Sequence, residues 1–380
     1  SAYATRSRFV VSNYGMGGSL QSGMAESRWG GPAAALLKWE TTNQFDIGLD
    51  IAFLNNRVNL TVDAYYKKTK DLLLDKLIPM SSGFSRIQAN YGNVTNKGLE
   101  ISGHFIPVKA RNFLWSIDAN ISFNRNKVGG LDADQYSDVA WGIENMFLVR
   151  NGEPIGTLYG YVEDGFYDNE AEVRADPLYR NETDSKVKSM VGEVKYKNLD
   201  DDPVIDNRDR QIIGNTNPDY QYGITNTLEW KNWTFSFFLQ GTQGNDVLNV
   251  NLKKFDMASV DNMPYFIYNN RWTAENRANA KWPRANRTST RFMRASDRYI
   301  EDGSYLRCKN VSLSYRFRHP MKFVESINLV ASVSNLFTIS GYSWMDPDVN
   351  SFGSDPKRRG VDMASYPSAR TFNFGVQIGF

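Results

Sequence analysis

The last eleven residues, 370–380, alternate between apolar and small or polar side chains up to the final residue. Large apolar residues occupy every second position from Phe372 to Phe380, and Asn, Gly and Gln fill the positions between them. Successive side chains of a strand point to opposite faces, so one face of this segment is apolar throughout. A strand of about 9–11 residues crosses a bilayer, with apolar residues toward lipid and polar ones toward the lumen. The segment therefore predicts one strand of an outer-membrane barrel.

Eight earlier segments repeat this alternation and pair into four hairpins. The hairpins are expected near 44–66, 99–123, 222–239 and 311–333, with short turns at 55–57, 107–111, 231–232 and 318–326. The loops that separate them are long and run roughly over 72–93, 127–218, 242–302 and 340–369. Such loops are uncommon in a compact soluble domain, whereas outer-membrane barrels combine short periplasmic turns with long extracellular loops. A soluble β-sandwich is the alternative, but its strands average about 5–6 residues.

The predicted fold is therefore all-β, a transmembrane antiparallel barrel of which this chain supplies nine strands. Bacterial single-chain barrels have even strand numbers, and an open sheet edge in lipid would leave backbone groups unpaired. We expect the remaining strands to come from an N-terminal part of the same protein or from another chain. The sequence starts at Ser1 with no signal-peptide pattern, which fits a processed chain or a piece of a longer one.

Composition agrees with a barrel and excludes other classes. The 44 basic and 42 acidic residues give no electrostatic case for nucleic acid. Aromatic residues make up 13% of the chain, as expected for the girdles of a barrel. Trp230 and Trp233 flank one predicted periplasmic turn, where an interfacial belt belongs. Cys308 is the only cysteine, and its alternation with Leu306 and Asn310 predicts that it faces inward.

Short motifs in order along the chain resemble the C-terminal part of SusC-like TonB-dependent outer-membrane transporters of the Bacteroidetes type. The matching stretches are Leu37–Thr42, Thr69–Leu73, Gly92–Val94, Asn96–Gly98, Gly160–Tyr161, Asp164–Gly165, Asn217–Asp219, Gly241–Asn245, Arg271–Thr273, Ser304–Arg307, Lys309–Asn310, Asn335–Thr338 and Asp346–Asp348. The resemblance implies the last nine strands of a 22-strand barrel. It assigns 1–40 to an extracellular loop and 43–380 to barrel strands and loops. The plug and the TonB-contacting segment would lie outside this chain.

One segment has the spacing of a calcium loop. Oxygen ligands at positions 1, 3, 5, 7, 9 and 12 would be Asn198, Asp200, Asp202, the Val204 carbonyl, Asp206 and Asp209. Pro203 stands where such a loop needs Gly, and Asp replaces the usual Glu at the last position. The segment therefore predicts either a structural Ca²⁺ site or a solvated acidic loop. No other cofactor is expected.

No arrangement of residues indicates an enzyme. The two histidines, His104 and His319, lie on a polar strand face and in a turn, and no nucleophile elbow or phosphate loop is present. The long loops carry Trp141, Trp272, Trp282 and Trp344, which are candidates for stacking on a substrate. Their alternative role is packing inside compact loops.

The resemblance implies energised import of a bulky nutrient across the Gram-negative outer membrane. The partners it implies are the N-terminal part of the transporter, a SusD-like surface lipoprotein acting as a lid, TonB acting through the plug, and outer-membrane lipid. An oligosaccharide is the expected substrate, and a peptide importer of the same family or a passive porin is the alternative. Phe380 is expected to act as an assembly signal.

Overall fold

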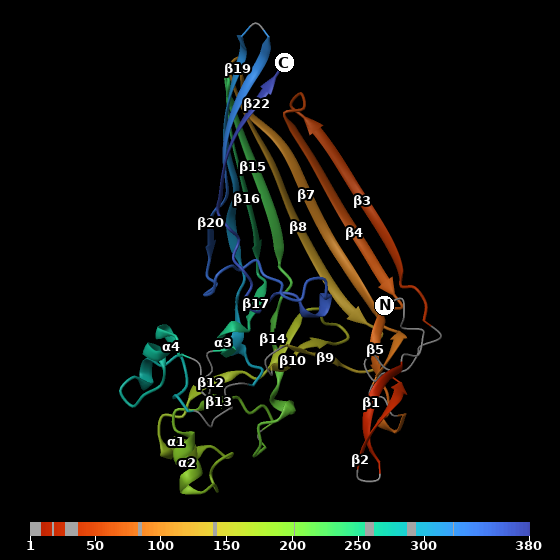
Figure 1. Cartoon of the computed structure of the whole chain (residues 1–380), viewed down its shortest axis with the longest axis vertical. Helices are drawn as coiled ribbons and strands as arrows, with labels where there is room; N and C mark the ends of the chain where they lie inside the picture. Colours follow the sequence, from red (N-terminus) through yellow and green to blue (C-terminus); the bar gives the residue numbers. More distant parts are fainter. Residues whose placement is uncertain are drawn as a thin grey trace.

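The computed structural model describes residues 9–16, 19–26, 37–82, 86–139, 143–200, 202–254, 262–286, 294–321 and 323–380. Its main element is one antiparallel sheet of nine strands in the order β22-β20-β19-β16-β15-β8-β7-β4-β3. The strands are β3 (Thr41–Phe53), β4 (Val58–Lys70), β7 (Asn93–Ala110), β8 (Phe113–Gly129), β15 (Tyr220–Trp230), β16 (Trp233–Gln243), β19 (Tyr305–Met321), β20 (Val324–Ser340) and β22 (Thr371–Gly379). The sheet curves as a section of barrel wall (Figure 1). The nine predicted strands are confirmed.

The outer face of this sheet is apolar and exposed. Phe45, Ile47 and Leu49 of β3 are 57–67% exposed, and each lies opposite an outward residue of β4. Phe374 of β22 is 84% exposed. The inner face is polar: Thr61 donates a hydrogen bond to Asp50 across β3 and β4 at 2.6 Å. This distribution of side chains is the one expected of a barrel wall between lipid and a wet lumen.

One polar side chain on the outer face is satisfied by a tryptophan. Asn226 of β15 lies opposite Phe237 and Ile117, whose side chains face outward. Its Oδ1 accepts a hydrogen bond from the indole Nε1 of Trp115 at 3.2 Å. A lone amide in hydrocarbon is costly, and this bond lowers that cost.

Two predicted turns are shorter than the sequence suggested. β7 continues to Ala110, so the segment predicted as the turn 107–111 is mostly strand and the turn is Arg111–Asn112. A β-bulge between Phe105 and Val108 accommodates Pro107, which cannot donate a ladder hydrogen bond. Likewise, pairing in the segment predicted as the turn 318–326 runs to Met321 and restarts at Val324.

Cys308 faces outward, contrary to the inward prediction. It lies opposite Leu239 of β16, an outward residue, and opposite Phe337 of β20. The pairing register shifts between Cys308 and Asn310, so one residue is inserted into the alternation of β19. A one-residue shift moves a side chain to the other face. Cys308 is nevertheless buried by its neighbours.

The long loops fold into a compact cap at the extracellular ends of the strands. Figure 1 shows the cap below the sheet, with the short turns at the opposite end. The cap contains β9 (Gln135–Val139), β10 (Ile143–Val149), β11 (Thr157–Gly160), β12 (Glu163–Phe166), β13 (Val194–Tyr196), β14 (Gln211–Asn215), β17 (Asp246–Asn249), β18 (Ile300–Asp302) and β21 (Val361–Asp362). Its helices are α1 (Glu170–Ala175), α2 (Asp184–Met190), α3 (Asn251–Lys254) and α4 (Tyr265–Asn270). In the described part of the chain, no helix is long and apolar enough to cross a membrane.

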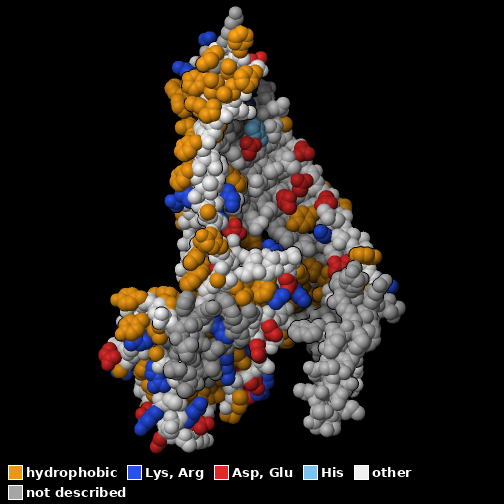
Figure 2. Space-filling model, in the orientation of Figure 1, with side chains coloured by type: hydrophobic (Ala, Val, Ile, Leu, Met, Phe, Trp, Pro, Cys, Tyr) orange, Lys and Arg blue, Asp and Glu red, His pale blue; other side chains and the backbone are white. Residues whose placement is uncertain are grey.

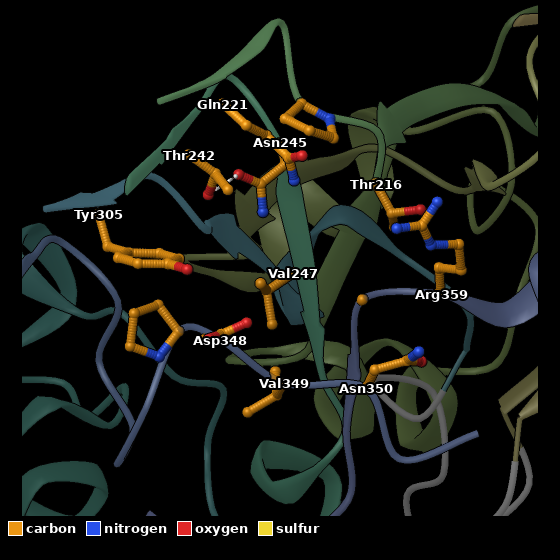
Figure 3. Close-up of a pocket in the computed structure, with 13 residues that line it drawn as sticks. Thr216, Gln221, Thr242, Asn245, Val247, Tyr305, Asp348, Val349, Asn350 and Arg359 are labelled. Carbon is orange, nitrogen blue, oxygen red and sulfur yellow. Dashed lines mark hydrogen bonds between the residues drawn. The ribbon is translucent and has the colours of Figure 1, made fainter. Parts of the chain in front are cut away.

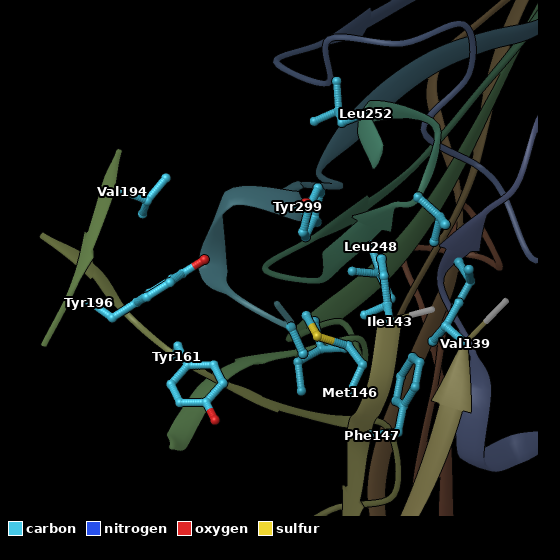
Figure 4. Packing of buried hydrophobic residues seen from close by; sticks show 14 of the residues in the cluster. Val139, Ile143, Met146, Phe147, Tyr161, Val194, Tyr196, Leu248, Leu252 and Tyr299 are labelled. Atoms are coloured by element: carbon cyan, nitrogen blue, oxygen red, sulfur yellow. The ribbon is translucent and has the colours of Figure 1, made fainter. Parts of the chain in front are cut away.

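The cap has its own hydrophobic core. Ile143, Met146 and Phe147 of β10 have no exposed surface and pack with Leu248 of β17 and Tyr299 (Figure 4). These residues come from loops that are far apart in sequence. Burial of this much apolar surface holds the loops in one arrangement.

Within the first 40 residues, the described segments 9–16, 19–26 and 37–40 are not part of the nine-stranded sheet. They include a separate hairpin of β1 (Phe9–Met16) and β2 (Ser19–Glu26), which pair with each other. A second small hairpin, β5 (Leu73–Leu77) with β6 (Arg86–Asn90), occupies the predicted loop 72–93.

Candidate functional site

The last long loop is tied to the barrel wall by a buried arginine. The Arg307 side chain, at the extracellular end of β19, is 1% exposed and forms an ion pair with Asp346. Its Nε donates to Thr338 Oγ1 of β20 at 3.0 Å, and Nη1 donates to Ser368 Oγ at 3.2 Å. The backbone N–H groups of Asp348 and Ser368 donate to the Asp346 carboxylate at 2.9 and 3.1 Å. The loop therefore leaves and rejoins the wall in a fixed position.

The environment of Asp346 favours its charged form. Burial acts to raise the pKa of this carboxyl, but the backbone and side-chain hydrogen bonds, including that from Arg307, hold the pKa below its usual value. Asp346 therefore stays ionised throughout the physiological range. The anchor of the loop is a charge pair under those conditions.

A polar pocket of about 250 Å³ lies between this loop and the rim of the barrel. It is lined by Thr216, Pro218, Gln221, Thr242, Asn245, Val247, Tyr305, Pro347, Asp348, Val349, Asn350, Arg359 and Gly360. Thr242 lies opposite both Gln221 and Tyr305 in the sheet, so the three share one face. Figure 3 shows these side chains around one space, with the Thr242–Asn245 hydrogen bond of 3.0 Å at its edge. Most lining groups can donate or accept hydrogen bonds.

The pocket holds one acidic and one basic side chain. Asp348 Oδ2 lies 3.6 Å from Nη1 of Arg307, so its charge is partly balanced from within the wall. Arg359 is exposed, and among the described residues it makes no hydrogen bond or ion pair. A guanidinium can donate two parallel hydrogen bonds to a carboxylate or to neighbouring hydroxyls. The pocket can thus hold a polar ligand through hydrogen bonds and one cation.

The predicted tryptophans fall in different environments, and Trp141 lies outside the described residues. Trp272 and Trp282 are each 8% exposed, and Trp272 donates its Nε1 hydrogen to Asp168 at 3.0 Å. Trp282 belongs to the cap core and lies beneath the Arg298 guanidinium. Trp344 is half-buried and lies in the loop that walls the pocket. Burial favours the packing role for Trp272 and Trp282, and substrate stacking stays a prediction for the set.

Three of the six predicted calcium ligands surround an arginine. Asp200, Asp202 and Asp206 each form an ion pair with Arg208, at 3.1 Å for Asp200 and Asp206. Arg208 lowers the pKa of Asp206, chiefly through the hydrogen bond between their side chains. Within the described residues, no three His, Cys, Asp or Glu side chains are placed to hold a metal. Arg208 thus supplies the positive charge that clustered carboxylates require.

The other three predicted ligands differ in their hydrogen bonding. Asp209 is 1% exposed, and its carboxylate accepts the N–H groups of Leu199 and Asp206, both at 2.8 Å. Asn198 Oδ1 is buried without a partner in the described structure. Val204 is half exposed, and its N–H donates to Asp202. An oxygen that lacks a donor is compatible with a cation ligand, whereas the Arg208 pairs occupy the neighbouring oxygens.

Two charged residues of the cap, Glu163 and Arg210, are not predicted from the sequence. Glu163 pairs with Arg298, and burial raises the pKa of Glu163 because desolvation outweighs the attraction of the arginine. Arg210 is 8% exposed and lies over the rings of Tyr159 and Tyr161 at 4.8 and 5.6 Å. Burial lowers the pKa of Arg210. No short motif marks these residues, because their partners come from distant segments.

Known proteins match both the sequence and the fold. The family described as TonB dependent receptor-like, beta-barrel matches residues 11–336. TonB-dependent receptor P26 of Formosa agariphila is 33% identical over 388 residues, covering 100% of this chain and 38% of the relative. TonB-dependent receptor SusC of Bacteroides thetaiotaomicron is 29% identical over 353 residues, covering 90% of this chain and 32% of the relative. The chain therefore spans less than two fifths of these relatives.

A solved structure confirms the fold. The structure of the RagAB peptide transporter aligns with a TM-score of 0.74 at 20% identity, over 100% of this chain and 39% of that one. The aligned region again covers a minor part of the longer protein. At this identity the match supports the barrel architecture.

Proposed function

Because the chain belongs to the TonB-dependent receptor-like β-barrel family of the outer membrane, we propose that it forms part of an importer for a bulky nutrient. The observation that carries this proposal is the polar pocket where the loop anchored by Arg307 meets the inner rim of the wall. A pocket in this position contacts a solute as it enters the lumen. The import would be TonB-dependent, and the chain would not act as an enzyme.

The partners follow from the open sheet. In the described part of the chain, β3 and β22 each pair with only one neighbour. Unpaired strand edges are prohibitive in a membrane, so the N-terminal part of the transporter would supply the remaining strands. That part would also carry the plug and the TonB-contacting segment. The SusC relative and the RagAB neighbour support a SusD-like surface lipoprotein as the partner over the cap.

The substrate class is proposed as an oligosaccharide. Hydroxyl, amide and charged groups line the pocket, and these suit a ligand rich in hydroxyl groups. A peptide is the second candidate. It is favoured by the likeness to the RagAB peptide transporter and by the presence of both an acidic and a basic residue in the pocket, Asp348 and Arg359, which suits a zwitterion. A passive porin is a third candidate, but the folded cap over the strand ends disfavours an open pore.

We also propose that segment 198–209 binds Ca²⁺ as a structural ion. Asn198 Oδ1 supports this, because it is buried without a hydrogen-bond donor among the described residues. Binding would require the Arg208 guanidinium to leave the three carboxylates. The ion would hold the acidic loop in place and would not take part in transport chemistry.

The complete transporter, incubated with an oligosaccharide digest and a peptide digest of equal mass, tests the substrate proposal. Mass spectrometry of the retained ligands should identify oligosaccharides, and Arg359→Gln and Asp348→Asn should lower retention. Lys357→Gln, a loop change outside the pocket lining, is the control. Retention of peptides alone would favour the second candidate. Equal retention by all variants would show that the pocket does not bind the ligand.

A further inference from the structure

An apolar groove crosses the outer face of the sheet near its periplasmic end. It has a volume of about 390 Å³ and runs over β16, β19, β20 and β22. Its walls include Trp233, Leu313, Tyr315, Leu329 and Phe374. Figure 2 shows hydrophobic side chains gathered over the upper end of β19, β20 and β22, which is this end of the wall.

The groove exists because a small residue stands between large ones. Ala331 lies opposite Leu313 on one side and Phe374 on the other, in a row of outward side chains. The next row toward the turn is Trp233, Tyr315, Leu329 and Val376, all paired directly across the strands. The methyl group of Ala331 leaves a depression whose floor is the strand backbone.

The aromatic wall lies at the level of a periplasmic turn. Trp233 follows the Lys231–Asn232 turn directly, and its ring meets that of Tyr315 edge-on at 4.6 Å between centroids. Arg316 N–H donates to Asn232 O at 3.0 Å, which fixes the turn beside β19. Tryptophan and tyrosine concentrate at the level of lipid headgroups. The groove thus begins at the inner interface and extends into the hydrocarbon layer.

A cation lies one strand beyond the aromatic wall of the groove, on the side of β15. Lys231 Nζ lies 5.2 Å from the ring centroid of Trp230, whose side chain faces outward opposite Trp233. The lysine ammonium is therefore on the lipid side of the wall at the membrane boundary. An ammonium in this position attracts the phosphate of a lipid headgroup.

We propose that this groove holds one acyl chain of a periplasmic-leaflet phospholipid, with the headgroup phosphate at Lys231. The groove supplies continuous apolar contact, and each methylene buried in it adds to affinity. The chain of the lipid would lie against Ala331 between Leu313 and Phe374. This bound lipid would be a fixed component of the wall, distinct from the lipids that exchange around it.

Native mass spectrometry of the complete transporter with added phosphatidylethanolamine tests the proposal. We expect one lipid to stay bound through activation, and Ala331→Phe, which fills the groove, to lower its retention about tenfold. Ala64→Phe makes the same change on the outward face of β4 and should leave retention unchanged. Unfolding in detergent, followed by gel mobility, shows that both variants fold.

A second pair of variants tests the contact between Lys231 and the lipid headgroup. Lys231→Gln should lower retention of the phospholipid, whereas Lys109→Gln, at the neighbouring periplasmic turn, should not. Equal lipid retention by Ala331→Phe and wild type would overturn the proposal. Retention of lipopolysaccharide in place of phospholipid would also overturn it. If Ala331→Phe instead dissociated a dimer of the transporter and left the bound lipid unchanged, the groove would be a contact between two copies, which would overturn the proposal as well.

Discussion

Arg307 and Asp346 form a buried ion pair that fixes the last extracellular loop to the inner rim of the barrel wall. Arg307 belongs to β19, and Asp346 lies in the loop that follows β20. The same loop walls the polar pocket through Pro347, Asp348 and Asn350. The shape of the pocket therefore depends on a charge pair that lies outside it.

Replacing Arg307 with Met should release this loop without unfolding the sheet. The change leaves the buried Asp346 carboxylate without its cation, and losing one partner of a buried pair costs about 3–5 kcal/mol. Hydrogen exchange over residues 341–369 should rise while exchange in β19 and β20 stays slow. Arg125→Met breaks an exposed pair with Asp219, worth about 1 kcal/mol or less, and serves as the control. Unchanged exchange in Arg307→Met would mean that the pair does not anchor the loop.

The anchor should weaken only in strong acid. The folded-state pKa of Asp346 is lowered, so its contribution is complete above the unfolded value of about 3.9 and is lost as pH falls through the folded pKa. Protection of 341–369 from hydrogen exchange should therefore be equal at pH 7 and pH 5, and should decrease below about pH 4. A loss of protection that is already present between pH 7 and pH 5 contradicts this assignment.

The Trp115–Asn226 hydrogen bond should stabilise the wall from the lipid side. Trp115→Phe leaves the Asn226 amide without this donor, and side-chain hydrogen bonds within membranes are worth about 0.6–2 kcal/mol. Unfolding of the complete transporter in lipid vesicles should show this loss. Adding Asn226→Leu to Trp115→Phe should recover most of it, because the polar group is then gone. A double variant as unstable as Trp115→Phe alone would rule out the hydrogen bond as the cause.

Calorimetry can show whether Ca²⁺ or only the Arg208 side chain neutralises the carboxylates of segment 198–209. If segment 198–209 is a calcium site, wild type should release or absorb heat with Ca²⁺, and Arg208→Gln should bind more tightly because its carboxylates are freed. Asp202→Ala should abolish the heat. The absence of heat from both wild type and Arg208→Gln would end the calcium proposal and leave Arg208 as the permanent counter-charge.

Alternation predicted the wall because each strand faces two uniform environments, lipid and lumen. It fails where one residue is inserted into a strand. The bulge between Cys308 and Asn310 turns Cys308 outward, and the bulge at Pro107 lies where the sequence pattern predicts a turn. The pocket could not be predicted, because it is formed by contacts between segments that are distant in the sequence. Residue spacing does not reveal such contacts, and Arg307 and Asp346 come from separate elements. The Asp346–Asp348 motif was visible in the sequence, but its pairing with Arg307 was not.

Phe380 is still predicted to act in assembly. It is 85% exposed after β22, so its side chain contributes little packing within the described structure. Deleting it should lower the amount of transporter inserted into the outer membrane more than it lowers ligand affinity of the inserted fraction. Surface labelling and ligand retention, measured on the same preparation, would distinguish these effects. Reduced affinity with normal insertion contradicts the prediction.

We propose that this barrel wall belongs to an importer driven by TonB. The decisive experiment measures uptake of a radiolabelled oligosaccharide, one that the complete transporter retains, in cells with and without TonB. We expect saturable uptake that is lost without TonB and is reduced in Arg359→Gln. Uptake that is unchanged without TonB and linear in concentration would indicate a passive pore and would rule out a TonB-driven importer.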